Sequence, residues 1–318
     1  MAVHPAAAMV VTKAAARHRA DAVERHGGDT YVVRMLPQTK HAGRHLHKYQ
    51  GTGNDFIVLD VTGEAVPAPP EKAQAAAWCD RHFGVGADGV LTVLPPAGDG
   101  AVARMHITNA DGSVPEMCGN GLRCVALYLR DTRPALGGSF TVETDAGPRS
   151  CTVEQHAPGD GFVTLSMGQV RVGAQSGFTA DVTRVVDGVT LRCLAVHVGN
   201  PHLVLDAPIP SVEVANRLGP GLVASAGFPH GTNVEWLVRD GDGLKVLVYE
   251  RGVGLTLACG TGAVASACAA EQWGWVDLAV AGGVRVGVPG GDLWIGRAGD
   301  GQATLRGPAR RVFAATVF

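Results

Sequence analysis

The sequence lacks the features that mark several large classes of protein. It has no run of about 18 apolar residues free of charged or turn residues, so it predicts no membrane-spanning helix. Its net charge is only −2 at pH 7 and its pI is near 6.6, so it lacks the basic surface expected of a nucleic-acid-binding protein or a polybasic membrane patch. These absences favour a small molecule as the partner.

Cysteine and lysine are also scarce. Seven cysteines are too few, and odd in number, for a disulfide framework, and no two of them form a Cys-x-x-Cys pair. Reduced thiols in a cytoplasm are the simplest interpretation. The chain has five lysines, and neither Lys72 nor Lys245 lies in a Gly-rich phosphate-binding context, which argues against pyridoxal phosphate as a cofactor.

What the sequence does have is one motif that occurs twice. Residues 116–126 read Glu-Met-Cys-Gly-Asn-Gly-Leu-Arg-Cys-Val-Ala, and residues 257–267 read Leu-Ala-Cys-Gly-Thr-Gly-Ala-Val-Ala-Ser-Ala. Each copy has a cysteine, a Gly-x-Gly turn and an apolar run that predicts a buried helix, so Cys118 and Cys259 are each expected at a helix N-terminus. The exposed N–H groups of a helix start stabilise a thiolate and also bind a carboxylate.

The repeat extends beyond the two cysteines. Residues 53–60 (Gly-Asn-Asp-Phe-Ile-Val-Leu-Asp) match residues 199–206 (Gly-Asn-Pro-His-Leu-Val-Leu-Asp), and a polar residue stands nine places before each cysteine, Asn109 and Glu250. This ordered similarity predicts two homologous halves. A site shared between the two halves follows as a hypothesis.

The same pattern predicts the domain organisation. Residues 1–43 lack alternation, and we expect a loosely ordered extension with at most a short helix over Thr12–His26. The first domain is predicted at residues 44–161 plus 306–318, because the last strand is expected to return to it, and the second at residues 162–305. Helices are expected at 70–82, after Cys118, at 211–218 and at 260–273, between short strands.

Polar residues in turns supply candidate ligands for a small substrate. Each asparagine fits a turn by itself, but amides also bind both ammonium and carboxylate groups. Arg251 is either half of a solvated ion pair or a bidentate carboxylate ligand. His202 and Glu250 are candidates for tuning the thiols, although His202 also fits a structural role. The four asparagines are Asn54, Asn109, Asn200 and Asn233.

Six motifs in order resemble diaminopimelate epimerase, over about residues 45–318. They are Gly-x-Gly-Asn-Asp-Phe (51–56), Asn-x-Asp-Gly-Ser-x-x-Glu-x-Cys-Gly-Asn-Gly-x-Arg-Cys (109–124), Gly-Asn-Pro-His (199–202), Gly-Thr-Asn (231–233), Glu-Arg-Gly-Val-Gly (250–254) and Ala-Cys-Gly-Thr-Gly (258–262). The resemblance implies an α/β (α+β) fold of two homologous, pseudo-symmetric domains. Each would be a curved, mainly antiparallel sheet around a central helix, with the active site in the interdomain cleft.

The resemblance also implies the activity. It is the cofactor-independent, metal-free conversion of LL-2,6-diaminopimelate to meso-diaminopimelate, in lysine and peptidoglycan precursor synthesis, by a cytoplasmic homodimer. Cys118 and Cys259 would be the catalytic acid and base, and His202 and Glu250 would tune the thiols. The substrate would be held by Asn54, Asn109, Gly119, Asn120, Asn200, Asn233, Glu250, Arg251, Gly260 and Thr261.

Three departures from the family pattern keep alternatives open. Leu255 stands where the family usually has Glu, Leu122 replaces a usual Ala, and Gly89 stands where some members have a substrate-contacting Gln. A racemase of another amino acid on the same scaffold is one alternative. A non-catalytic protein that uses the two thiols for redox sensing or binding is the other.

Overall fold

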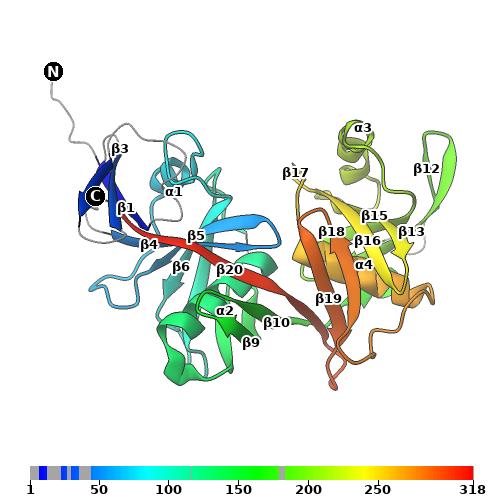
Figure 1. Ribbon diagram of the computed structural model, residues 1–318. Helices are drawn as coiled ribbons and strands as arrows, with labels where there is room; N and C mark the ends of the chain where they lie inside the picture. Colours follow the sequence, from blue (N-terminus) through cyan, green and yellow to red (C-terminus); the bar gives the residue numbers. More distant parts are fainter. Residues whose placement is uncertain are drawn as a thin grey trace. The chain divides into compact units, whose positions relative to one another are not determined.

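The structure is a computed structural model of the 318-residue chain, and it describes residues 7–12, 23–26, 30–35, 44–115, 117–178 and 183–317 (Figure 1). The chain divides into two compact units. The first comprises Met1–Gly51, Asp55–Gly161 and Ala309–Phe318, and the second comprises Thr52–Asn54 and Phe162–Pro308. The sequence pattern had put the boundaries after residues 161 and 305.

The turn Thr52–Asn54 belongs to the second unit, whereas the sequence pattern had placed it in the first domain. A Cβ added to Gly53 would lie 3.0 Å from Cδ1 of Leu257, and one added to Gly290 would lie 2.0 Å from the carbonyl oxygen of Thr52. Gly290 in turn donates its N–H to the carbonyl of Leu257 at 2.8 Å. The turn that carries Asn54 therefore lies against the loop that leads to Cys259.

The first unit alternates parallel and antiparallel strand pairs, with a helix inside each parallel connection. Strand β5 runs parallel to β6, β6 antiparallel to β7, β7 parallel to β8, and β8 antiparallel to β9. The elements are β4 (Arg44–Gly51), β5 (Asn54–Asp60), α1 (Lys72–Cys79), β6 (Gly89–Leu94), β7 (Ala103–Asn109), α2 (Gly119–Thr132), the 3-10 turn η1 (Pro134–Leu136), β8 (Ser139–Thr144) and β9 (Gly147–Ala157).

The second unit repeats this topology. Strand β14 runs parallel to β15, β15 antiparallel to β16, β16 parallel to β18, and β18 antiparallel to β19. The elements are β10 (Asp160–Gly168), β11 (Arg171–Val172), η2 (Gly173–Ser176), β12 (Thr183–Val186), β13 (Val189–His197), β14 (Pro201–Asp206), α3 (Val212–Val223), β15 (Asn233–Asp240), β16 (Gly243–Glu250), β17 (Gly254–Leu255), α4 (Gly260–Gln272), β18 (Val284–Val288) and β19 (Gly291–Arg297). The matching order confirms that the sequence repeat is a repeat of the fold.

The last strand returns to the first unit, as the sequence pattern predicted. Strand β20 (Ala303–Val317) is one long strand, drawn in red in Figure 1. Its first residues pair with β19, and the residues from Arg310 onward pair with β4. The register with β4 has an irregularity between Arg311 and Phe313.

The N-terminal extension forms strands instead of the expected loose segment with a short helix. Strand β1 (Ala7–Thr12) pairs antiparallel with the end of β20 and with β3 (Thr30–Met35), and β2 (Val23–His26) pairs with β3. The helix expected over 12–26 is therefore wrong at Thr12 and Val23–His26, and its remaining residues lie outside the described ranges. The exposed edge of β20 and the β-branched residues of β1 and β3 account for the difference.

One helix occupies the centre of each unit. Helix α2 contacts β4, β6, β7 and β9, and α4 contacts β11, β13, β14, β15, β16, β18 and β19. In α4 the residues from Gly262 to Ala270 are all buried, and all but Val264 and Cys268 are Gly, Ala or Ser. Such small side chains let strands approach the helix from several sides. Within the described ranges, no helix has the length and apolar character needed to cross a membrane.

Candidate functional site

The two duplicated cysteines cap the two central helices in the same way. Cys118 precedes α2 with φ −136° and ψ 109°, and Cys259 precedes α4 with φ −117° and ψ 110°. The sulfur of Cys118 accepts a hydrogen bond from the N–H of Gly121 at 3.3 Å, and that of Cys259 accepts one from Gly262 at 3.4 Å. Each thiol thus occupies the position of a side-chain N-cap, where the helix dipole and the donated N–H favour the thiolate.

The glycine three residues after each cysteine is required by close packing. A Cβ added to Gly121 would lie 2.7 Å from Cδ2 of Leu91, and a Cβ added to Gly262 would lie 3.0 Å from Oε1 of Glu235. Neither distance leaves room for a side chain without movement of the neighbour. The second glycine of each Gly-x-Gly turn therefore lets the first helical turn rest on a strand of the sheet.

Cys259 lies in surroundings that favour the neutral thiol. Burial raises the pKa of Cys259 well above its ordinary value, and the nearby negative charge of Glu250 raises it further. Hydrogen bonds from Thr261 and from the N–H of Gly262 act in the opposite direction, and Glu235 adds a smaller raising effect. Cys259 is therefore held as the neutral thiol until a donor or a substrate group stabilises the negative charge of its thiolate.

His202 contacts a carboxylate that the sequence analysis did not select. Its Nδ1 lies 2.6 Å from Oε1 of Glu235, and both side chains are fully buried. Its Nε2 lies 2.9 Å from Oδ1 of Asn200, whose Nδ2 lies 3.4 Å from Oγ1 of Thr261. Oγ1 of Thr261 lies 3.5 Å from the sulfur of Cys259. The predicted thiol-tuning histidine thus reaches Cys259 through two polar side chains.

Glu250 and Arg251 are held by their own loop. Oε1 of Glu250 accepts a hydrogen bond from Oγ1 of Thr256 at 2.6 Å. Arg251 donates from Nη1 to the carbonyls of His230 and Gly231 at 2.9 and 3.3 Å, and its side chain is exposed. Its backbone N–H donates at 3.0 Å to Oδ1 of Asn233, and Nδ2 of Asn233 donates at 3.1 Å to the carbonyl of Pro201.

The first unit holds the predicted residues around Cys118. Nδ2 of Asn109 donates to Oγ of Ser113 at 2.9 Å, and the buried amide oxygen of Asn120 accepts from Nη1 of Arg123 at 2.8 Å. Arg123 is the largest fully buried side chain of the described residues. Burial lowers the pKa of Arg123 to about 10, whereas its interactions with Cys124 and Cys118 oppose that shift.

The predicted site residues fall into two groups. Asn109, Cys118, Gly119 and Asn120 belong to the first unit, and the other nine belong to the second. The sequence analysis missed Glu235 and Arg123. A signal for Arg123 was available, since the motif 109–124 contains it. The only signal for Glu235 was a lone carboxylate in an otherwise apolar stretch of a predicted strand.

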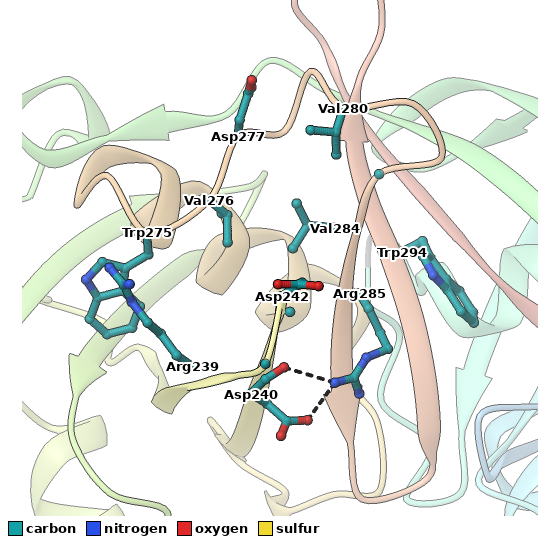
Figure 2. Close-up of a pocket in the computed structure, with 13 residues that line it drawn as sticks. Arg239, Asp240, Asp242, Trp275, Val276, Asp277, Val280, Val284, Arg285 and Trp294 are labelled. Atoms are coloured by element: carbon teal, nitrogen blue, oxygen red, sulfur yellow. Dashed lines mark hydrogen bonds and ion pairs between the residues drawn. The ribbon is translucent and has the colours of Figure 1, made fainter.

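One surface cavity is lined by none of these residues. It has a volume of about 810 Å³ and is formed by the β15–β16 turn, the segment after α4 and strands β18 and β19 (Figure 2). Its arginines are engaged within the protein, since Arg285 pairs with Asp240 at 2.6 Å and the Arg239 guanidinium lies 5.1 Å from the Trp275 ring centre.

Over the described ranges, no cluster of three His, Cys, Asp or Glu side chains has an arrangement that would hold a metal ion.

Comparison with known proteins identifies the family of the chain. A model of the diaminopimelate epimerase family matches residues 46–173 and 194–312. The chain belongs to this family. It is therefore an isomerase, and its relatives are epimerases.

Curated relatives support the assignment, and solved structures share the fold. Diaminopimelate epimerases of Xylella fastidiosa (strain M12) and Ectopseudomonas mendocina (strain ymp) are each 39% identical to the chain, over 85% of its length and 94% and 97% of theirs. That of Stutzerimonas stutzeri (strain A1501) is 40% identical over 85% of the chain and 97% of its own length. A hydroxyproline epimerase from Agrobacterium vitis shares the fold, with a TM-score of 0.64 at 16% identity over 87% of this chain and 91% of its own. A methylitaconate delta-isomerase does so with a TM-score of 0.58 at 15% identity, over 87% and 96%.

The structure shows how this member of the family accommodates its three departures. Leu255 is half-buried against the apolar core of the second unit and pairs with Tyr249 in the short β17 ladder. Leu122 is fully buried in α2. A Cβ on Gly89 would lie 2.9 Å from the carbonyl oxygen of Thr108, so the strand pairing leaves no room for a side chain there. Each of the three residues is explained by packing within its own unit.

Proposed function

We propose that this protein converts LL-2,6-diaminopimelate to meso-diaminopimelate by proton exchange at one α-carbon, with Cys118 and Cys259 as the acid–base pair and without a cofactor. The observation that carries the proposal is the matched pair of thiols. Each caps the central helix of one homologous unit and accepts an N–H from the glycine three residues on. Inversion of a stereocentre needs an acid and a base on opposite faces of one carbon, and a duplicated fold supplies two such groups.

The proposed cycle moves two protons. One cysteine, as the thiolate, takes the α-proton, and the other, as the thiol, gives its proton to the opposite face. The enzyme then holds the opposite protonation pattern, which is the starting state for the reverse reaction. Because the surroundings of Cys259 raise its pKa, Cys259 is the proton donor of the resting enzyme. We assign Cys118, whose sulfur accepts the N–H of Gly121, the part of the first base.

The carbanion is stabilised by the two helix starts. The first-turn N–H groups of a helix have no partner within it, and α2 and α4 both begin directly after a catalytic thiol. We assign the N–H groups of Gly119, Asn120, Gly260 and Thr261 to the α-carboxylate as it gains enolate character. A well-placed donor of this kind contributes about 3 kcal/mol to the transition state.

The remaining polar residues suit the rest of the substrate, which carries two ammonium and two carboxylate groups. Asn54, Asn200 and Asn233 offer amides that bind either charge, and Glu250 offers a carboxylate for an ammonium group. The exposed guanidinium of Arg251 is oriented by two backbone carbonyls, which suits a distal carboxylate. We assign Asn109 of the first unit to the same group of substrate-binding amides.

The test is turnover of LL-diaminopimelate by the natural protein and by two variants. We expect the natural protein to form the meso isomer, and Cys118→Ala and Cys259→Ala each to lose turnover because one face lacks its proton carrier. Near-normal turnover in either variant contradicts the two-thiol mechanism. Racemisation of a single-centre amino acid with no action on diaminopimelate favours the alternative of a racemase, and binding without proton exchange favours a non-catalytic thiol protein.

Two further assignments belong to the same proposal. We infer a cytoplasmic location, supported by the seven cysteines, which are all free thiols. We also infer a homodimer, which is supported by the family membership alone. Light scattering of the purified protein at micromolar concentration tests the second assignment, and a monomer there contradicts it.

A further inference from the structure

The second unit contains a buried ionisable pair that the first unit lacks. By register, His202 on β14 stands beside Asn233 on β15, and Phe56 on β5 stands beside Gly89 on β6. Glu235 follows two residues after Asn233, and Leu91 follows two residues after Gly89. The pair His202 and Glu235 therefore occupies the positions that Phe56 and Leu91 hold in the first unit.

The equivalence extends to the helices above these strands. Leu91 is the side chain that a Cβ on Gly121 would meet, and Glu235 is the one that a Cβ on Gly262 would meet. All four side chains of the two pairs are at most 2% exposed. Since the first unit folds with Phe and Leu at these positions, the fold itself does not require a histidine and a carboxylate there.

A buried ionisable pair is an expensive alternative to an apolar pair. Replacing such a pair by apolar residues of similar volume is often neutral or stabilising. Among the described residues, Oε2 of Glu235 has no hydrogen-bond partner, which adds to its cost. A role in the chemistry at Cys259 accounts for the presence of the pair.

The contacts around His202 form a chain with one direction. Nε2 of His202 faces the amide oxygen of Asn200, which can only accept, so Nε2 carries a proton. Nδ2 of Asn200 then donates to Oγ1 of Thr261. Oγ1 of Thr261, having accepted that bond, directs its own O–H toward the sulfur of Cys259.

We propose that Glu235 is a positioning residue for Cys259: by holding Nδ1 of His202 it fixes the ring, the Asn200 amide and finally the Thr261 hydroxyl that donates to the Cys259 sulfur. This inference rests on the proposed function of Cys259 as one of the two proton carriers. This series of hydrogen bonds acts by orienting the side chains. No proton passes along it, because the amide of Asn200 is not a proton relay. The equivalent positions in the first unit are Phe56 and Leu91, which cannot form these hydrogen bonds, so the arrangement belongs to Cys259.

The experiment measures the reactivity of Cys259 without diaminopimelate. The rate of its alkylation by iodoacetamide at pH 8 is read from the Cys259 peptide by mass spectrometry, and the Cys118 peptide of the same sample is the control. The main variant is His202→Phe/Glu235→Leu, which copies the first unit and is therefore expected to fold with an unchanged or higher melting temperature. Thr261→Val removes the last donor of these hydrogen bonds, and Glu235→Gln keeps a hydrogen-bonding group beside Nδ1 of His202 without the charge.

The hydrogen bond from Thr261 lowers the pKa of Cys259, so its loss should raise that pKa. Alkylation of Cys259 should therefore become about tenfold slower in the double variant and in Thr261→Val. The variant that combines His202→Phe, Glu235→Leu and Thr261→Val (the triple variant) should be no slower than Thr261→Val. Glu235→Gln should stay within about threefold of the natural protein. Cys118 should react unchanged throughout.

An unchanged Cys259 rate in the folded double variant overturns the proposal. So does a Glu235→Gln protein as slow as the double variant, or a triple variant slower than Thr261→Val. If the double variant does not fold, Asn200→Ala breaks the same chain, and an unchanged Cys259 rate in that protein also overturns the proposal. Because the assay uses no diaminopimelate, it tests the role of Glu235 even if the protein does not catalyse the proposed reaction.

Discussion

Leu255→Glu restores the residue that diaminopimelate epimerases usually have before the second cysteine, and the structure predicts a loss of stability without a gain in turnover. Leu255 is half-buried and packs against the core of the second unit. Full burial of a leucine stabilises by about 1.5–3 kcal/mol, so half-burial contributes about 1 kcal/mol. The new carboxylate also stands next to the position that pairs with Glu250. We therefore expect the free energy of unfolding to fall by about 1–2 kcal/mol.

The assay for this variant is urea unfolding together with kcat/KM for LL-diaminopimelate. Val253→Glu is the matched control, because it adds the same charge to the same loop at a side chain that is 69% exposed. We expect the control to keep its stability, and both variants to keep kcat/KM within about threefold, because Leu255 packs against the core of the second unit. A tenfold rise of kcat/KM in Leu255→Glu refutes this reasoning and shows that the natural protein lacks a substrate ligand.

Three further predictions concern single contacts. Glu250→Gln removes a negative charge that raises the pKa of Cys259, so alkylation of Cys259 at pH 8 should become several-fold faster, and a slower reaction contradicts that electrostatic role. Tyr49→Phe removes a buried hydroxyl that donates to Asp131 at 2.8 Å, so thermal unfolding should show a loss of about 1 kcal/mol, and an unchanged melting temperature contradicts it. A chain that begins at Arg44 should keep its turnover, because among the described residues β1 pairs with the end of β20 and with β3, and inactivity of a folded truncated protein contradicts this.

The sequence predicted the central helices and their thiols because these elements carry local signals. A cysteine, a Gly-x-Gly turn and a long run of small apolar residues define a buried helix start without knowledge of its neighbours. The second copy of the motif then made the equivalence of Cys118 and Cys259 visible. The return of β20 to the first unit was also predictable from the repeat, because the last strand of a duplicated chain often returns to the first half.

Contacts that depend on strand register were beyond the sequence. Glu235 lies in a strand whose pattern gives no reason to pair it with His202, 33 residues earlier in the chain. Only the parallel ladder between β14 and β15 brings these two side chains together. The N-terminal strands were missed because the edge of β20 supplies their pairing, and the turn Thr52–Asn54 was assigned to the wrong unit because its partners are Leu257 and Gly290.

The most direct test of the central claim is proton NMR of LL-diaminopimelate with the natural protein in D₂O. Proton exchange between two thiols and one α-carbon predicts that deuterium enters the α-position as the meso isomer accumulates. No deuterium should enter in the presence of Cys118→Ala/Cys259→Ala. An α-proton signal that persists while the natural protein remains folded contradicts the account, and so does deuterium uptake that survives the loss of both thiols.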